Sequence, residues 1–187
     1  MHLGCDLVVL LDVGGDVLAH GDERGLASPL ADAIVLAAAP ALAASGVGVL
    51  GAVFGAGCDG ELTPGEVLDR LREVEAAGGG RGDSALDEPT LELLADGVRA
   101  VPTEASAMAL RCALGETGAR AIRGGRRSVQ LTPEGGRVFF FDPGIAIGSA
   151  ARLARAVQGA ADLAEADRVL AARGVRTELA YEREAAA

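Results

Sequence analysis

Aromatic residues are scarce in this sequence, and lysine is missing altogether. It contains no tryptophan, one tyrosine and four phenylalanines, yet half of its 187 residues are hydrophobic. The interior must therefore be built from alanine, valine and leucine, which pack closely when helices lie on a sheet. The length suits one domain, and no linker-like stretch divides it. We predict a single α/β domain over residues 1–187.

Cysteine and histidine are also too few for several kinds of site. Cys5, Cys58 and Cys112 form no CxxC pair, which argues against a disulfide framework and a zinc cluster. Two histidines, one of them at position 2, disfavour zinc hydrolysis. No GxGxxG or Walker motif occurs, so dinucleotide redox and nucleoside triphosphate chemistry are disfavoured.

Excess positive charge and long apolar runs are missing as well. The formal net charge is -10, which repels nucleic acid phosphates and anionic membranes. The first apolar run ends at Asp12 after a few residues, and no basic region precedes it. It is too short for a signal peptide or a membrane span. We therefore predict a cytoplasmic protein with neither nucleic acid nor membrane as a partner.

The elements that are present alternate between strands and helices. Residues 7–11 form a continuous aliphatic run, typical of a central strand buried on both faces of a parallel sheet. Ser28 can cap a helix that starts at Pro29, and residues 47–54 form a second buried strand. This strand–helix–strand unit predicts a parallel pair. Further helices are expected over residues 64–77, 87–98, 104–114 and 151–172.

The last third of the sequence predicts a hairpin. Residues 128–131 and 138–141 flank Thr132-Pro-Glu-Gly-Gly like the arms of an antiparallel pair. Residues 78–83 read as a flexible break, and the polar tail after Glu178 is expected to fray. The predicted fold is a three-layer, Rossmann-like α/β structure, with a mostly parallel sheet flanked by helices and a C-terminal antiparallel hairpin.

Carboxylates crowd the loops that follow the first two strands. Asp12 and Asp16 follow the first strand, and Asp59 follows the second. Ligands bind beyond the carboxyl ends of strands in open α/β sheets, so these loops are the candidate site. Such carboxylates can hold a cation such as Mg²⁺, through Asp12 and Asp16, or act as general acids and bases. Alternatively, Asp12 and Asp16 cap nearby N–H groups, and the other acids of the two loops are solvated surface charges: Asp22, Glu23, Asp59 and Glu61.

Other residues of these loops also have a functional and an ordinary interpretation. His20 can shuttle protons or be a plain loop residue. Gly14 and Gly15 allow the backbone to approach a ligand closely. Cys58 stands at a strand–helix junction, where it is either an activated nucleophile or inert core. Asp32, in the first turn of its helix, either favours the helix dipole or faces the site.

The second half of the chain supplies candidates for the opposite wall of the site. Thr103 and Glu104 begin a helix, as cap and first-turn acid, or else line the pocket. The densest positive patch comprises Arg123, Arg126 and Arg127. It can hold a substrate carboxylate or phosphate, or offset the acidic surface.

Several long blocks of this sequence carry a family resemblance. They are LLDVGGDVLAHGDERGLASPLADA, LGAVFGAGCDGELTPGEVLDRL, VPTEASAMAL, IRGGRRSVQLTPEGGRVFFFDP and GVRTEL. Together they resemble the family catalogued as domain of unknown function 1152, which implies an α/β fold and no established reaction. The loop from Asp12 to Asp16 also looks like the aspartate–glycine–glycine–acid loop of D-glutamate cyclases, which interconvert an amino acid and its lactam.

The resemblance also implies a missing part. Members of that family usually begin with a glycine-rich strand–loop–helix unit before the equivalent of Leu7. The chain is then a shortened form or the C-terminal half of a split protein. A sheet without its first strands exposes edge groups and apolar surface, which is costly for a soluble monomer. We therefore expect a companion chain that supplies this unit, or a homo-oligomer.

These features favour an enzyme of the hydrolase or lyase/cyclase type that acts on a small polar metabolite. Asp12 and Asp16 would serve as base or cation ligands, and His20 as proton shuttle. The remaining site residues would form the opposite wall or bind substrate: Asp59, Glu104, Gly14, Gly15, Cys58, Thr103, Arg126 and Arg127. The alternative is a non-catalytic subunit or ligand-binding module that completes the fold of a partner chain.

Overall fold

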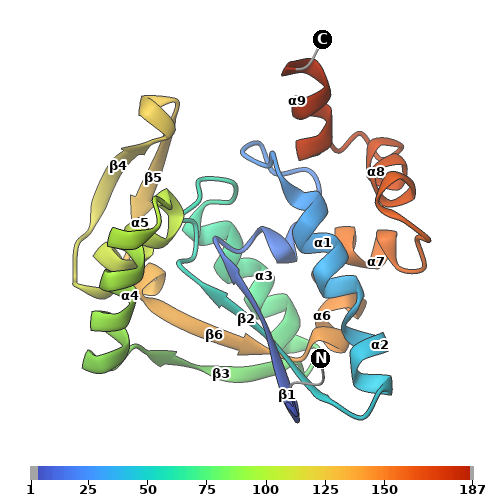
Figure 1. Cartoon of the computed structure of the whole chain (residues 1–187), viewed down its shortest axis with the longest axis horizontal. Coiled ribbons are helices and arrows are strands. Elements are labelled where there is room, and N and C mark those ends of the chain that lie inside the picture. The colour runs from blue at the N-terminus through green and yellow to red at the C-terminus, as the bar shows by residue number, and fades with distance from the viewer. Residues whose placement is uncertain (1–3, 186–187) are drawn as a thin grey trace.

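The main sheet of the protein is mixed. The computed structural model describes residues 4–185, and its four-stranded sheet has the order β1-β2-β6-β3 (Figure 1). The strands are β1 (Leu7–Val13), β2 (Gly48–Phe54), β3 (Gly80–Ala85) and β6 (Arg137–Phe141). Only β1 and β2 are parallel, whereas β6 runs antiparallel to both β2 and β3. A second, two-stranded antiparallel sheet consists of β4 (Gly118–Ile122) and β5 (Arg127–Leu131).

The α/β content is confirmed, but the predicted mostly parallel, Rossmann-like sheet is wrong. The chain does not continue from β2 into further parallel strands; instead β6 inserts beside β2, with Val53 opposite Phe139. The predicted hairpin of residues 128–131 and 138–141 is also wrong, because these segments belong to different sheets. The predicted flexible break at residues 78–83 is largely strand β3. Apolar runs identify strands, but they carry no information about strand direction or neighbours.

Strand β1 is an edge strand, so its predicted central position is wrong. Its residues alternate between a covered and an open face, and Leu7, Val9 and Leu11 are 53%, 44% and 56% exposed. Asp12, on the covered face, is buried. The aliphatic run was therefore misleading, because apolar residues also line the open face of this strand.

Helices form in every segment where the sequence predicts them. They are α1 (Pro29–Ala37), α2 (Ala39–Ala44), α3 (Pro64–Ala76), α4 (Glu88–Ala100), α5 (Glu104–Ala113), α6 (Pro143–Gly148), α7 (Arg152–Val157), α8 (Leu163–Ala171) and α9 (Glu178–Ala185). The tail after Glu178, expected to fray, forms α9. Thr63 and Glu66 make a reciprocal capping box at the start of α3. Neither Ser28 nor Thr103 accepts a capping hydrogen bond through its side chain. Among the described residues, no helix has the length and apolar character that a membrane crossing requires.

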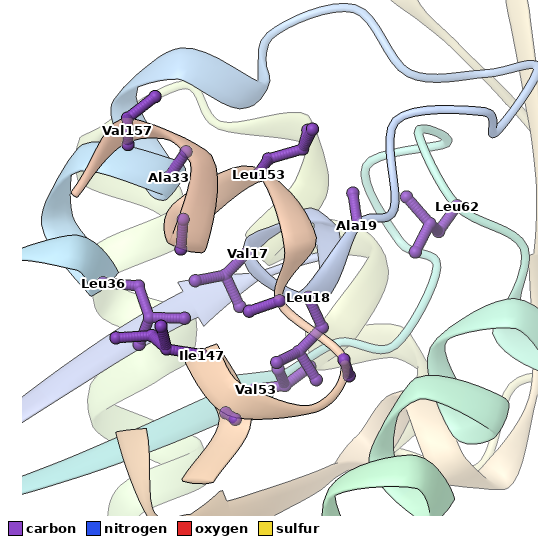
Figure 2. Packing of buried hydrophobic residues seen from close by; sticks show 14 of the residues in the cluster. Val17, Leu18, Ala19, Ala33, Leu36, Val53, Leu62, Ile147, Leu153 and Val157 are labelled. Atoms are coloured by element: carbon purple, nitrogen blue, oxygen red, sulfur yellow. The ribbon is translucent and has the colours of Figure 1, made fainter. Parts of the chain in front are cut away.

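The core consists of two clusters on opposite faces of the main sheet. The larger one packs α1, α3, α6, α7 and α8 against Val53 of β2, and Figure 2 shows part of it. The smaller one packs α5 and the β4–β5 sheet against Phe54, the next residue of β2. Consecutive residues of a strand point to opposite faces, so the end of β2 joins both clusters. Figure 1 shows α4, α5, β4 and β5 gathered at one end of the sheet.

Candidate functional site

The loops after β1 and β2 are hydrogen-bonded to each other. Both strands end at the same edge, with Val13 opposite Phe54. Immediately beyond them, the Gly14 amide donates to the Phe54 carbonyl at 3.0 Å, and the Gly57 amide donates to the Gly14 carbonyl at 2.7 Å. The parallel pairing therefore continues into the loops and brings their acidic residues together.

Gly14 and Gly15 are required because other side chains occupy the space beside them. Gly14 has φ 141°, and a Cβ atom there would lie 2.4 Å from Cγ of Asp59. Gly15 has φ 111°, and a Cβ atom would lie 2.7 Å from methyl groups of Val67. Both positions combine a left-handed backbone with a close contact, which only glycine tolerates. Here the close approach predicted for a ligand is made by the protein's own Asp59.

Five carboxylates converge at this edge in two overlapping groups. Carboxylate oxygens of Asp12, Asp16 and Asp32 all lie within 4.8 Å of one another, and so do those of Asp16, Asp59 and Glu61. Asp16 belongs to both groups. All of them are buried except Asp32, which is half-buried. The structure thus joins Asp12, Asp16 and Asp59, three of the residues expected from the sequence.

These carboxylates differ in their hydrogen bonds. Asp12 Oδ2 accepts from the amides of Gly15 at 2.8 Å and Val17 at 3.4 Å, so it does cap its loop. Asp59 Oδ1 accepts from the Glu61 amide at 3.1 Å. Within the part of the chain that the structure describes, no group donates to the Asp16 carboxylate. Asp16 therefore has no capping role.

Glu61 is the best-satisfied acid of the site. Its Oε2 accepts from the amides of Ala27 at 2.8 Å and Ser28 at 2.9 Å, and its Oε1 accepts from the Ser28 hydroxyl. A guanidinium nitrogen of Arg123 lies 3.8 Å from Oε1. The serine expected to cap α1 instead fastens the loop before α1 to the loop after β2.

Burial and mutual repulsion disfavour ionisation of this cluster. Burial, reinforced by Asp32 and Asp59, raises the pKa of Asp12 to about 8. Burial, reinforced by Asp12, Asp32 and Asp59, raises the pKa of Asp16 well above its usual range. Burial raises the pKa of Asp59 to about 7, and burial with nearby Glu178 raises the pKa of Asp32 to about 6. At neutral pH the site therefore holds protons that ordinary carboxylates have lost.

A cavity of about 330 Å³ opens beside Asp59. The residues around it are Asp59, Thr103, Glu104, Ala105, Ile122, Arg123 and Arg126. Glu104 accepts the Arg123 amide at 2.9 and 2.8 Å through its two oxygens, and Arg126 Nε donates to the Arg123 carbonyl at 3.0 Å. Thr103, Glu104 and Arg126, expected from the sequence, thus share one cavity with Asp59. The lining thus combines two arginines with two acids, Asp59 and Glu104.

Arg127 stabilises the Asp59 loop from outside the cavity. Its guanidinium donates to the Gly60 carbonyl at 3.0 Å, which ties this loop to strand β5. The structure therefore places Arg127 as a support of the site rather than beside Arg126 in the cavity wall.

His20 lies in different surroundings from the carboxylate cluster. Its Nε2 is 3.1 Å from a carboxylate oxygen of Glu73, and it lines a separate cavity with Arg152 and Arg173. Burial, followed by the charge of Arg70, lowers the pKa of His20. Among the described residues, no contact thus joins His20 to Asp12 or Asp16, as the expected proton-shuttle role would require.

Glu23 holds the loop that contains His20. Its two oxygens accept from the amides of His20 and Gly21, each at 2.8 Å, and Arg70 forms an ion pair with it at 3.2 Å. These bonds lower the pKa of Glu23, although its burial opposes them. Glu23 is therefore a structural acid, and Asp22 beside it is exposed.

Cys58 is part of the smaller core cluster. It is fully buried, and its sulfur lies 3.8 Å from the sulfur of Cys112. Contact with Cys112 and burial raise the pKa of the Cys58 thiol. A thiol in this environment is not a ready nucleophile, and its location agrees with the inert-core interpretation.

Three residues of the site are clearer in the structure than in the sequence. The sequence shows Asp32 and Glu61 as acids in or near the loops, but the direction of their side chains depends on how α1 and the loop after β2 pack. Arg123 stands out because its φ is 53°, a left-handed backbone that is rare outside glycine. No sequence signal marks that conformation.

Comparison with known proteins identifies a family but no activity. The family model described as "Protein of unknown function (DUF1152)" matches residues 1–186, so the family resemblance is confirmed. No curated protein and no solved structure matches the chain. The likeness to D-glutamate cyclases and the missing N-terminal unit are shown by none of these comparisons. Any function must be argued from the site itself.

Proposed function

The chain belongs to the DUF1152 family of proteins of unknown function, and we propose that it is an enzyme acting on a small polar metabolite by carboxylate-based acid–base chemistry. The observation that carries the proposal is the position of Asp59. Its carboxyl group belongs to the buried acidic cluster, and the residue also lines a cavity together with Arg123 and Arg126. A titratable group thus faces a space that a ligand can enter.

Asp59 is the group suited to proton transfer. Its pKa of about 7 allows both protonation states near neutral pH, which a general base or acid requires. Asp16 lies in the same carboxylate group and can exchange a proton with it through a short path. Hydrolysis, elimination and ring closure to a lactam all need such a proton acceptor, so the reaction class is hydrolase or lyase/cyclase.

The two arginines suit the binding of an anionic group. Arg123 and Arg126 line the cavity from one segment, and guanidinium groups bind carboxylates and phosphates through paired hydrogen bonds. Glu104 fixes the Arg123 backbone and therefore the position of this wall. A substrate with a carboxylate or phosphate would thus orient its reacting carbon or water toward Asp59.

The test uses a panel of small carboxylate and phosphate metabolites, because the substrate is not identified. The purified chain is incubated with the panel at neutral pH, and mass spectrometry follows substrate loss and product formation. We expect turnover of at least one compound, and its loss in Asp59→Asn with an unchanged melting temperature or a higher one. Asp96→Asn, an exposed acid on α4, is the matched control. Equal turnover in Asp59→Asn and the native chain would contradict the role of Asp59.

One observation favours the second candidate function, a non-catalytic subunit that completes a partner's fold. The open face of β1 presents Leu7, Val9 and Leu11 to solvent, and β1 is the edge of the sheet. Exposed apolar faces and open strand edges are typical of surfaces that bind another chain. The candidates differ in the metabolite screen, because a purely structural subunit would leave every compound unchanged.

A further inference from the structure

We propose that Asp12, Asp16 and Asp32 form a binding site for one hard divalent cation, Mg²⁺ or Ca²⁺. The cation would lie at the carboxyl end of β1, next to the carboxylate of Asp59. The inference rests on the proposed function only for the use of the cation in a reaction. Binding itself is measured without any substrate, so the two proposals can fail separately.

The first support is the unsatisfied carboxylate of Asp16. This residue is only 6% exposed, and within the described residues nothing donates a hydrogen bond to its side chain. Buried carboxylates are normally paired with donors, cations or metals, because an isolated charge in the interior is very costly. A carboxylate oxygen of Asp16 lies among those of other acids, and a cation bound there would supply the partner that Asp16 lacks.

The second support is the spacing of the oxygens. One oxygen from each of Asp12, Asp16 and Asp32 can be chosen so that all three lie within 4.8 Å of one another. Oxygens on opposite sides of one cation are separated by about 4.2 Å for Mg²⁺ and about 4.6 to 5.2 Å for Ca²⁺. At most one of the three pairs can be opposite on one ion, so the other oxygens must lie closer than this limit. Rotation of the carboxylates within the limit would let the three share one ion, with water completing its coordination.

The neighbouring acidic groups are less suitable. In the group of Asp16, Asp59 and Glu61, the oxygens of Glu61 already accept two amides and a hydroxyl. In the group of His20, Asp22 and Glu23, the oxygens of Glu23 accept two amides and the Arg70 guanidinium. By contrast, both hydrogen bonds to Asp12 end on Oδ2, which leaves Oδ1 for a metal.

The chain holds the three ligands on well-packed elements. Asp16 begins the short 3-10 helix η1 (Asp16–Leu18), and Val17 and Leu18 anchor it in the larger core cluster, as Figure 2 shows. Asp32 lies on α1, whose Ala33 and Leu36 enter the same cluster (Figure 2). Amides of Gly15 and Val17 orient Asp12. Ligands fixed by packing in this way form a preorganised site.

The chemistry of the donors selects the ion. Carboxylate oxygens without thiolate or imidazole suit Mg²⁺ and Ca²⁺ rather than Zn²⁺ or Cu⁺. In the proposed enzyme, Asp16 would connect the ion to Asp59 and thereby to the cavity, because it belongs to both carboxylate groups.

The test is isothermal titration calorimetry of the full chain, freed of metal with chelator, with MgCl₂ and CaCl₂ in separate experiments at neutral pH. We expect binding of one ion, weakened about 100-fold in Asp16→Asn. Asp96→Asn, which removes the same charge from an exposed helix surface, should bind like the native chain.

Two further measurements keep the result decisive. Melting temperatures without metal show whether each variant is folded, and Asp32→Asn, at a half-buried position, replaces Asp16→Asn if the latter does not fold. The absence of binding heat and of any melting shift with both salts would overturn the proposal. Unchanged affinity in a folded Asp16→Asn or Asp32→Asn would overturn it as well. Cation binding without turnover of any metabolite would leave the site standing and contradict the proposed function.

Discussion

Asp59 occupies the space that a side chain on Gly14 would need: a Cβ atom at position 14 would lie 2.4 Å from the Asp59 Cγ. Because of this contact, the two acidic loops can approach closely enough for Asp16 and Asp59 to join one carboxylate group. A glycine in one loop thus sets the position of the proposed base in the other. The relationship makes Gly14 a sensitive position for both stability and function.

We expect Gly14→Ala to destabilise the fold by about 2 to 4 kcal/mol, because alanine adds both a clash and an unfavourable left-handed backbone. Urea unfolding followed by circular dichroism measures this loss. The matched control is Gly97→Ala in helix α4, where a Cβ atom meets nothing within 4 Å. That change should stabilise the chain by about 0.5 to 1 kcal/mol. A Gly14→Ala variant as stable as the native chain would contradict the described packing of the loops.

The acidic cluster predicts a stability that falls as pH rises. The pKa of Asp12 is raised from 3.8 to about 8 on folding, so the folded state binds its proton more tightly than the unfolded state. The contribution to stability is therefore full below the unfolded pKa and is lost as pH rises toward the folded pKa. Each unit of difference corresponds to roughly 1.4 kcal/mol.

Asp12→Asn isolates this effect, because it removes the titrating group and leaves other acids in place. We expect the stability advantage of Asp12→Asn over the native chain to grow between pH 5 and about pH 8, measured by urea unfolding without divalent ions. The difference in unfolding free energy between the variant and the native chain cancels the contribution of acids that both share. Glu23 is one of these: its pKa is lowered, so its contribution to stability has the opposite pH dependence. A constant difference across this range would show that Asp12 ionises normally in the folded protein.

The open face of β1 predicts association with another chain or a second copy. We expect the purified native chain to be larger than a monomer by size-exclusion chromatography with light scattering, and Leu11→Lys to shift it toward the monomer. Leu163→Lys on α8, which changes a similarly exposed leucine elsewhere, should have no effect. A native chain that runs as a stable monomer at all concentrations would show that the open face of β1 requires no partner.

The sequence predicted the local elements of this fold better than their arrangement. Caps, prolines and apolar spacing located the helices, since these signals depend on neighbouring residues. The apolar run at Leu7, Val9 and Leu11 gave no sign that one face of β1 is open. Likewise, the Phe-rich strand β6 carries no local mark of its place between β2 and β3. Strand order depends on long-range contacts, which a local pattern does not encode.

The candidate site shows the same difference between features set by local sequence and features set by long-range packing. Acids after β1 and β2 could be placed at one sheet edge, because parallel strands end together. His20 shares a loop with Asp16 in sequence, yet its side chain contacts Glu73 on α3. The position of Glu104 beside Arg123 depends on packing of α5 against the β4–β5 sheet, which no spacing rule predicts. The direction of a side chain from a loop was thus the least predictable feature.

Arg123 offers a test of the strained segment in the cavity wall. Its backbone has φ 53°, and Glu104 holds this conformation by accepting its amide. Glycine adopts such a backbone without the steric cost of a Cβ atom, whereas alanine retains that cost. We therefore expect Arg123→Gly to be more stable than Arg123→Ala by about 1 kcal/mol in urea unfolding. Both variants remove the guanidinium, so both should raise the KM for an anionic substrate to a similar extent. Equal stability of the two variants would show that residue 123 leaves the left-handed region in solution, and the cavity wall would then need a different Arg123 backbone.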